Sequence, residues 1–482
     1  MKGDRGGLAL VLHSHMPYVE GFGTWPFGEE WLWEAVATVY LPLLDLLDSA
    51  PLTVGLTPVL CDQFEALRGD AAERYLQFLR QTRADIHTED ARSFDDVGEG
   101  GLAGEVRRAA GDYTRGEQRF LERGRDLVKA FADLDRVELW TSSASHAVLP
   151  LVATEAGRRL QLATGVASHE RRFGSFGGGF WLPECAYEPG LERDLADFGV
   201  RAFCLDQTAV NGYGGLDNLE PVATEAGPVA VPLDWQTVEL VWCESSGYPA
   251  AGAYRDYHHR TTHDLRPWNN AREPYRHDEA LALAREHARD FVQRAIARLE
   301  AHAAERGRPG LLTCALDTEL LGHWWYEGQA WLAGVLEEAE DAGLELLTLS
   351  EGLERVPPVE RELARSSWGK GKDLSTWDSP QVAEIVFEAR DAELRTVAAA
   401  ASAQHHNDAL ERAARELLAL QSSDWAFQVT CDLAADYPLR RVRAHADGVD
   451  AALSALKDSA PAPPPAVRGL APDLDIASLV AP

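Results

Sequence analysis

The hydrophobic positions of the chain fall into short apolar runs, separated by longer amphipathic or charged stretches. Runs of strand length lie at 8–12, 52–60, 137–140, 177–184, 202–205, 238–242, 310–317 and 344–349. Residues 62–134 have a charged helical pattern that a glycine-rich loop at 98–101 interrupts, and 278–306 have the pattern of an amphipathic helix. Short apolar strands that alternate with helices predict an α/β fold with a parallel sheet.

The pattern changes near residue 380, where the strand-like runs end. Residues 384–400, residues 408–420 and the stretch after Pro438 have helical periodicity, and from Ser459 the chain is rich in proline. We predict a barrel domain at 1–355 with insertions at about 62–134 and 244–306, a C-terminal helical domain at 356–458 and a disordered tail at 459–482. The irregular part of the second insertion, 244–275, has the length of a functional loop.

Polar residues stand where several predicted strands end, namely His13, His15, Glu184 and Asp317. A barrel of parallel strands builds its site at the carboxyl ends of those strands. His13 and His15 are two positions apart and face the same side of their strand. This geometry suits two metal ligands, and equally two hydrogen-bond donors to a bound sugar.

The composition narrows the range of partners. The chain has 46 Lys and Arg against 77 Asp and Glu, a net charge of −31, so nucleic acid and anionic membrane are poor partners while a neutral substrate is not repelled. The six cysteines are scattered and predict buried free thiols in a reducing compartment. The first apolar run is too short for a signal-peptide core, and no later run could span a bilayer. We therefore expect a cytoplasmic protein.

Two carboxylates have the setting that glycosidic chemistry needs. Glu184 directly follows an apolar strand and a proline, and Asp317 ends another strand, with Glu319 as a competing acid. In a glycosidase one carboxylate attacks the sugar while the other donates and then accepts a proton, and a separation of roughly 5–5.5 Å predicts retention of configuration. The 14 tryptophans supply flat apolar surfaces for sugar rings, several of them in glycine- or proline-rich loops.

Several segments, in order along most of the chain, resemble glycoside hydrolase family 57, and within it the α-1,4-glucan branching enzymes. The segments are HSHMPY at 13–18 followed by WPFGEEW at 25–31, WTSSASH at 140–146, WLPECAY at 181–187, DTELLGHWWYEG at 317–328, the aromatic stretch 366–377 and QSSDW at 421–425. The resemblance implies an incomplete TIM-type barrel, (β/α)7, with an inserted helical subdomain and a C-terminal all-helical domain.

The same resemblance implies the site and its chemistry. It places the nucleophile at Glu184 and the acid/base at Asp317, and it implies no metal and no other cofactor. The substrate contacts that we expect from these motifs are His13, His15, Trp25, His146, Trp181, Trp268, His323, Trp325, Trp368, Trp377, Asp424 and Trp425.

The activity expected is that of a retaining 1,4-alpha-glucan branching enzyme, with an α-1,4-glucan as both donor and acceptor, in a monomer or small homo-oligomer. Two departures bear on transfer: Lys370 and Lys372 occupy a stretch that is usually acidic and glycine-rich, and 206–236 is compact, with Tyr213 as its candidate aromatic tip. An α-glucan hydrolase of the amylase type is therefore the alternative.

Two further readings come from other classes of protein. A metal-dependent hydrolase would use His13, His15, His146 and Asp317 as its ligands. A non-catalytic glucan-binding protein on the same barrel would bind glucan without turnover, although both acids are present.

Overall fold

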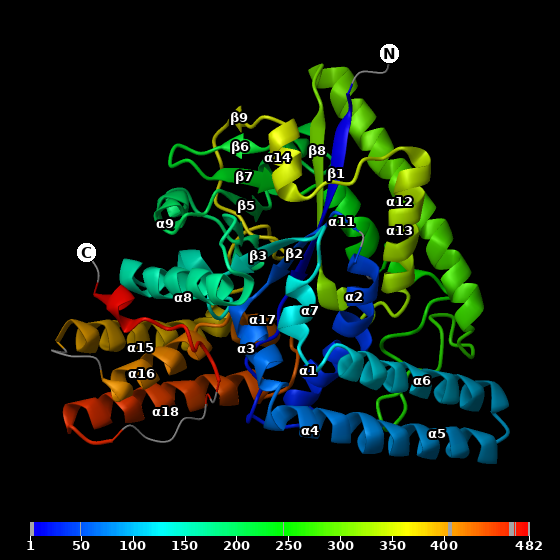
Figure 1. The fold of residues 1–482 in the computed structure, drawn as a ribbon, viewed down its shortest axis with the longest axis horizontal. Coiled ribbons are helices and arrows are strands. Elements are labelled where there is room, and N and C mark those ends of the chain that lie inside the picture. Colours follow the sequence, from blue (N-terminus) through cyan, green and yellow to red (C-terminus); the bar gives the residue numbers. More distant parts are fainter. Residues whose placement is uncertain are drawn as a thin grey trace.

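The computed structural model describes residues 4–48, 50–243, 245–402, 407–461, 467 and 469–480. Within them, a nine-stranded sheet has the order β8-β1-β2-β3-β4-β5-β7-β6-β9 (Figure 1). The strands are β1 (Gly6–Ser14), β2 (Thr53–Leu56), β3 (Glu138–Ser142), β4 (Gly179–Trp181), β5 (Ala202–Leu205), β6 (Val222–Ala223), β7 (Val229–Pro232), β8 (Gly310–Asp317) and β9 (Val359–Glu360).

From β8 through β1, β2, β3, β4 and β5 to β7, every pair of neighbouring strands is parallel. Only β6 runs antiparallel to its neighbour β7. The strands β1, β2, β4 and β5 are buried along their whole length, as expected of parallel strands that are covered on both faces. The predicted incomplete TIM-type barrel is thus confirmed.

Helices cover the sheet and extend from it. The first insertion is helical as predicted, and α5 and α6 lie side by side and project away from the sheet (Figure 1). The predicted helix 278–306 is confirmed as α12. The helices up to α14 are α1 (Glu29–Ala35), α2 (Leu41–Leu47), α3 (Pro58–Ala66), α4 (Asp70–Gln77), α5 (Ala84–Asp96), α6 (Gly100–Glu122), α7 (Leu127–Ala132), α8 (Glu155–Phe173), α9 (Leu191–Asp197), α10 (Thr208–Asn211), α11 (Trp235–Trp242), α12 (His277–Arg306), α13 (Gly328–Ala342) and α14 (Leu349–Arg355).

Three predicted strands differ in the structure. The run 238–242 is wrong as a strand, because it belongs to helix α11, whose buried residues Thr237, Val238 and Val241 have helical spacing. The run 52–60 is a strand only as far as Leu56, since Pro58 begins α3. The run 344–349 contributes only an isolated bridge between Leu346 and β1, and the chain then enters α14.

The C-terminal part is helical, as predicted: α15 (Ala383–Ser402), α16 (Asp408–Leu420), α17 (Ser423–Thr430) and α18 (Tyr437–Lys457). The prediction of a disordered tail differs from the structure for residue 467 and residues 469–480. Val467, Leu470 and Leu479 are buried, and the Ala471 N–H donates to Asp62, 2.7 Å away. The rest of the predicted tail beyond Pro461 lies outside the described residues.

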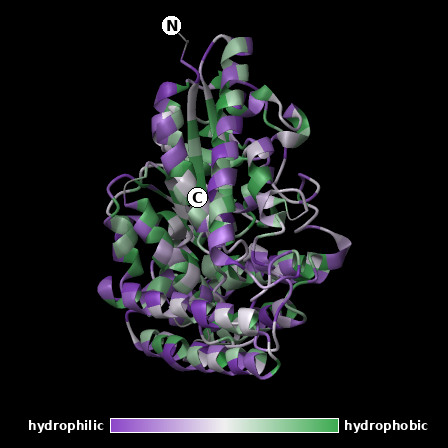
Figure 2. Ribbon diagram, turned by 90° about the vertical axis from the view of Figure 1, so that its right-hand side faces the viewer, coloured by the Kyte–Doolittle hydropathy of each residue, from purple (hydrophilic) through white to green (hydrophobic). Residues whose placement is uncertain are grey.

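Hydrophilic and hydrophobic residues alternate along the covering helices (Figure 2), as expected of amphipathic helices that each turn one face to a core. Among the described residues, no helix combines the length and the apolar character needed to cross a bilayer. Of the six free cysteines, Cys61, Cys185, Cys204 and Cys314 are buried as expected, whereas Cys243 is partly exposed and Cys431 is exposed.

Candidate active site

Glu184 lies just beyond β4, in a short turn that Pro183 begins. Its backbone is left-handed, with φ 61° and ψ 19°. One carboxylate oxygen, Oε2, accepts a hydrogen bond from the indole N–H of Trp368 at 2.9 Å. The other, Oε1, accepts one from the Ser423 hydroxyl at 2.7 Å. The backbone N–H of Trp368 also donates to the Glu184 carbonyl at 2.9 Å, so the residue is held from both its main chain and its side chain.

Asp317 is the last residue of β8 and lies beside His13 in the neighbouring strand β1. Burial raises the pKa of Asp317 well above its ordinary value, and the negative charges of Glu319, Glu184 and Asp424 raise this pKa further. A carboxyl group in that setting favours its protonated form.

The environments of the two carboxyl groups differ in one respect that matters for chemistry. Burial also raises the pKa of Glu184 above its ordinary value, but the hydrogen bonds from Ser423 and Trp368 offset part of this rise and stabilise the ionised form. No such donor is among the main influences on the pKa of Asp317, where every one of them raises the pKa. The pair is therefore polarised, with Glu184 suited to be the ionised group and Asp317 the protonated one.

Glu319, the competing acid, is hydrogen-bonded to other residues of the barrel domain. Its carboxylate accepts hydrogen bonds from the Tyr40 hydroxyl and from the His15 backbone N–H. Burial raises the pKa of Glu319 to about 7. Because its Oε1 is already engaged by both donors and the residue is only 7% exposed, Glu319 is less available to a substrate than a rim carboxylate.

Three histidines form a stack beside these acids. The rings of His15 and His146 stack at a centroid distance of 4.0 Å, and His13 stacks on Trp181 at 4.5 Å. The Nε2 atoms of His13 and His146 are hydrogen-bonded to each other at 2.9 Å. Burial lowers the pKa values of His13 and His146 well below the ordinary range, and His15 lowers them further. Both rings are therefore neutral, one donating and the other accepting.

His15 has the opposite character. Burial opposes a charged ring, but the carboxylate of Asp424, 2.8 Å from Nε2, raises the pKa of His15 above its ordinary value. Ser423, the residue before Asp424, contacts His146 Nδ1 at 2.9 Å as well as Glu184. Helix α17 thus supplies two side chains to this cluster. Within the described chain, no three or more His, Cys, Asp or Glu side chains are grouped as a metal ion requires.

Trp368 reaches Glu184 from a loop that we call the clamp segment, residues 364–378. The segment is joined to the barrel by a backbone bridge between Ser366 and Tyr187. It is also joined by Lys372, whose Nζ lies 2.8 Å from Asp206 and 2.9 Å from the ring centroid of Trp235. Asp206 directly follows β5 and is fully buried. An ion pair of this kind fixes the segment, because breaking it would leave a buried charge without a partner.

A line of tryptophan rings leads away from Glu184. Trp368 contacts Trp242 at a centroid distance of 6.1 Å, and Trp242 contacts Trp324 at 6.4 Å. Trp242 and Trp324 are 38% and 41% exposed, so part of each ring can contact a ligand. Such surfaces suit the apolar faces of sugar rings.

The other predicted substrate contacts differ in how exposed they are. Trp325, Trp377 and Trp425 are at most 2% exposed and lie in hydrophobic clusters, so we do not assign them substrate contacts. Trp25 is 64% exposed, and Trp268 packs edge-on against His259 at 4.1 Å.

The structure forms two contacts that the sequence patterns did not indicate. Ser423 stood inside the QSSDW segment, but nothing in that segment indicated that its hydroxyl reaches Glu184. The pairing of Lys372 with Asp206 links positions 166 residues apart, which periodicity cannot detect. Tyr213, the expected aromatic tip, is 57% exposed.

Comparison with known proteins shows what this chain is similar to. The model of glycosyl hydrolase family 57 matches residues 9–364, and a model of the C-terminal region of 1,4-alpha-glucan branching enzymes matches residues 388–464. A 1,4-alpha-glucan branching enzyme of Thermococcus kodakarensis is 33% identical over 92% of this chain and 72% of its own length. A probable 1,4-alpha-glucan branching enzyme of Mycobacterium tuberculosis is 34% identical over 92% of this chain and 90% of its own.

A solved structure gives the same result over nearly the whole molecule. The crystal structure of a GH57-type branching enzyme from Pyrococcus horikoshii superimposes with a TM-score of 0.90 at 28% identity, covering 99% of this chain and 97% of that one. With the family model matching more than half of its length, the chain belongs to glycosyl hydrolase family 57.

Proposed function

We propose that the protein is a retaining 1,4-alpha-glucan branching enzyme, which cleaves an α-1,4 glucan and transfers the released chain to a 6-hydroxyl. The observation that carries this proposal is the polarised pair of partly buried carboxyl groups at the ends of β4 and β8. Glu184 accepts two side-chain hydrogen bonds that favour its ionised form, whereas the surroundings of Asp317 favour its protonated form.

In the first step the Glu184 carboxylate attacks C1 of the glucan while Asp317 donates its proton to the glycosidic oxygen. The bond between C1 and that oxygen breaks, the remainder of the chain leaves with a new hydroxyl, and a covalent glycosyl ester forms on Glu184. The donors Trp368 and Ser423 hold the carboxylate in one orientation for the attack.

In the second step Asp317, now ionised, takes the proton from the 6-hydroxyl of an acceptor glucan. The acceptor oxygen forms a bond to C1, the ester bond to Glu184 breaks, and an α-1,6 branch results. Two inversions at C1 give net retention. Water as the acceptor would give hydrolysis, so the ratio of branching to hydrolysis depends on how well the site admits sugar and excludes water.

The proposal assigns no cofactor, because the two carboxyl groups account for both steps. Its partners are α-1,4-glucan chains as donor and acceptor, with no nucleic acid and no membrane, and the enzyme acts as a monomer or small homo-oligomer. The buried free thiols support a cytoplasmic location.

The Glu184→Gln variant tests the nucleophile. Without the carboxylate no ester forms, so we expect the activity on amylose to fall by roughly 10⁴-fold or more. Initial rates on amylose measure the loss, and circular dichroism shows that the variant is folded. A variant that still branches at the wild-type rate would overturn the assignment.

Debranching of the product tests transfer against hydrolysis. Amylose is incubated with the enzyme, and the product is then treated with an enzyme that cuts only α-1,6 bonds. New short chains that are released at this stage show branching. An increase in reducing ends before debranching, with no short chains afterwards, would identify the α-glucan hydrolase instead.

A further inference from the structure

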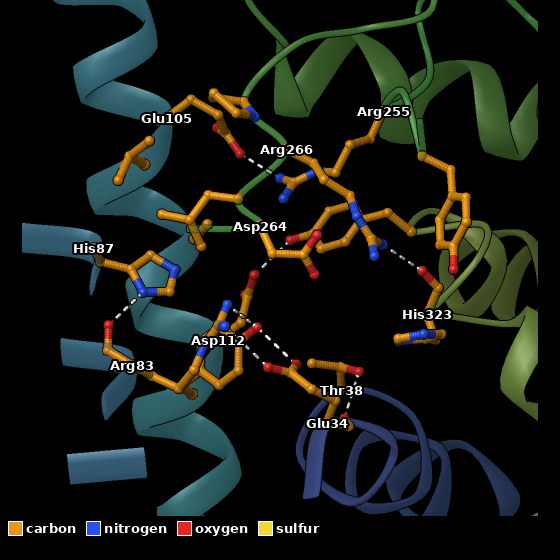
Figure 3. Close-up of a pocket in the computed structure, with 18 of the residues that line it drawn as sticks. Glu34, Thr38, Arg83, His87, Glu105, Asp112, Arg255, Asp264, Arg266 and His323 are labelled. Carbon is orange, nitrogen blue, oxygen red and sulfur yellow. Dashed lines mark hydrogen bonds and ion pairs between the residues drawn. The ribbon is translucent and has the colours of Figure 1, made fainter. Parts of the chain in front are cut away.

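A cavity of about 100 Å³ lies between the α5–α6 pair and the loops that precede α12 and follow β8 (Figure 3). Side chains from both sides point toward one another across it: Arg83 and Glu105 from the helical side, and Arg255, Arg266 and His323 from the loop side. Charged and aromatic side chains line it, unlike a packing defect in a hydrophobic core.

The cavity wall contains hydrogen-bond donors that have no acceptor. The Nε atoms of Arg83, Arg255 and Arg266 are buried and lack a hydrogen-bond partner within the described part of the chain. The side chains of Arg83 and Arg255 are only 9% and 10% exposed. Such unsatisfied buried groups are costly unless a ligand or ordered water completes them.

Arg266 differs from the other two in its partners. Its guanidinium stacks on Tyr257 at 4.1 Å and donates to the His323 carbonyl at 3.1 Å, but among the described residues it forms no ion pair with a carboxylate. Arg83 pairs with Glu34, and Arg255 pairs with Glu105. Burial lowers the pKa of Arg266, which is consistent with a guanidinium whose charge the protein itself leaves poorly compensated.

The charges of the lining select the class of ligand. Alongside the three guanidiniums stand four carboxylates, those of Glu34, Glu105, Asp112 and Asp264. The guanidiniums would attract an anion, but the carboxylates would repel it. A neutral polyhydroxylated ligand fits both, since each hydroxyl can accept from a guanidinium N–H and donate to a carboxylate.

The cavity is connected to the nucleophile by aromatic rings. Trp324 lines the cavity and contacts Trp242, which contacts Trp368, which donates to Glu184. From these observations we propose that the cavity is a second glucan-binding site, which holds a part of the α-glucan chain remote from the bond that is cleaved. This inference rests on the proposed function for the identity of the sugar.

Binding to the inactive Glu184→Gln protein tests the site without turnover. Calorimetry measures the dissociation constants of maltoheptaose, which is long enough to reach both sites, and of maltose, which is not. Adding Arg266→Gln removes charged donors, so we expect about tenfold weaker binding of maltoheptaose and unchanged binding of maltose. Trp324→Ala, at a half-exposed position, is the second variant and should act in the same direction.

Arg272→Gln is the matched control, because Arg272 belongs to the same loop but is 61% exposed and does not line the cavity. Maltoheptaose that binds equally well to the Arg266 and Trp324 variants, or not at all to the starting protein, would overturn the inference. Competition by inorganic phosphate that Arg266→Gln abolishes would overturn the choice of a neutral ligand. Wild-type protein that is inactive on amylose while the chain-length effect persists would refute the proposed function and leave the cavity site standing.

Discussion

The backbone of Glu184 is left-handed, a conformation that costs a residue with a side chain about 1–2 kcal/mol. The turn at Pro183 and the hydrogen bond from the Trp368 N–H to the Glu184 carbonyl hold the residue there. Strain of this kind persists where the surrounding structure over-determines it, as it does at functional sites. In this conformation the carboxylate accepts hydrogen bonds from Trp368 and Ser423.

The indole of Trp368 sets the acid side of the pH profile. Its hydrogen bond lowers the pKa of Glu184, so Trp368→Phe should raise this pKa. Attack needs the ionised carboxylate, and a higher pKa means that protonation removes it at a higher pH. We therefore expect the acid limb of kcat/KM on amylose to move to higher pH.

Trp331→Phe is the control for this measurement, because Trp331 is fully buried in α13 and its indole N–H has no partner within the described structure. Its pH profile should match the wild type. An acid limb that stays in place in Trp368→Phe, or moves to lower pH, would contradict the role given to this hydrogen bond.

At the scale of elements, the ion pair between Lys372 and Asp206 holds the clamp segment in place and thereby positions the indole of Trp368. Lys372 fastens the segment to Asp206 at the end of β5, and Trp368, four residues earlier, contacts Glu184. Lys372 also packs over Trp235, the first residue of α11. The lysine that distinguishes this stretch is thus a structural tie between three elements.

Replacing Lys372 by methionine should loosen the clamp segment. The substitution leaves the buried Asp206 carboxylate unpaired, which costs about 3–5 kcal/mol. We expect kcat on amylose to fall by roughly tenfold or more as Trp368 loses its position. Lys372→Arg should retain much of the rate, and adding Asp206→Asn to Lys372→Met should recover stability, because the unpaired charge is removed.

Lys370→Met is the matched control, since Lys370 lies in the same segment and is exposed. It should leave kcat and the unfolding temperature unchanged. Equal effects of Lys370→Met and Lys372→Met, or no effect of either, would show that the ion pair with Asp206 does not position Trp368.

The comparison of elements shows how far the sequence could predict this site. Glu184 follows one apolar strand and Asp317 ends another. Because the carboxyl ends of parallel strands share one edge of the sheet, the periodicity of the sequence was enough to predict that both residues lie at that edge. The prediction of a strand at 238–242 was wrong because an apolar stretch of that length suits a helix and a strand equally. The strand that pairs with β5 is β7, and it was not predicted because its Pro232 is unusual in a central strand.

The contacts of Ser423, Lys372 and Arg266 could not be predicted, because each depends on how segments far apart in the chain dock. A hydroxyl or an ammonium group has no periodicity of its own. The prediction for the tail from Ser459 differed from its described part for a related reason. The prolines suggested disorder, whereas the buried side chains of Val467, Leu470 and Leu479 are too far apart in the sequence to form a recognisable pattern.

On the scale of the whole molecule, the described part of the tail fastens the C-terminal helices to the barrel. Leu470 and Leu479 pack in the same hydrophobic cluster as Leu417 of α16. The Gly469 N–H donates to the Tyr18 hydroxyl at 2.9 Å, and Tyr18 belongs to the loop that follows β1. The tail therefore contributes to the docking of the part of the molecule that carries Ser423 and Asp424.

Leu470→Ala should destabilise the protein measurably. Leu470 is 1% exposed, and truncating a fully buried leucine costs about 2–5 kcal/mol of the free energy of unfolding. Thermal unfolding followed by circular dichroism measures the shift in midpoint. Val480→Ala is the control, because this valine is 49% exposed and its truncation should cost less than about 0.5 kcal/mol. Equal midpoints for the two variants would show that the tail carries no stability.

Ser423 donates to Glu184, which precedes it by 239 residues. Ribosomes release the amino-terminal strands first, and domains fold as units during synthesis. A nascent polypeptide that has completed every strand of the sheet but has not yet exposed α17 lacks one of the two side-chain donors to Glu184. Competence for the proposed glycosyl transfer therefore depends on a helix that is synthesised after the strands of the sheet.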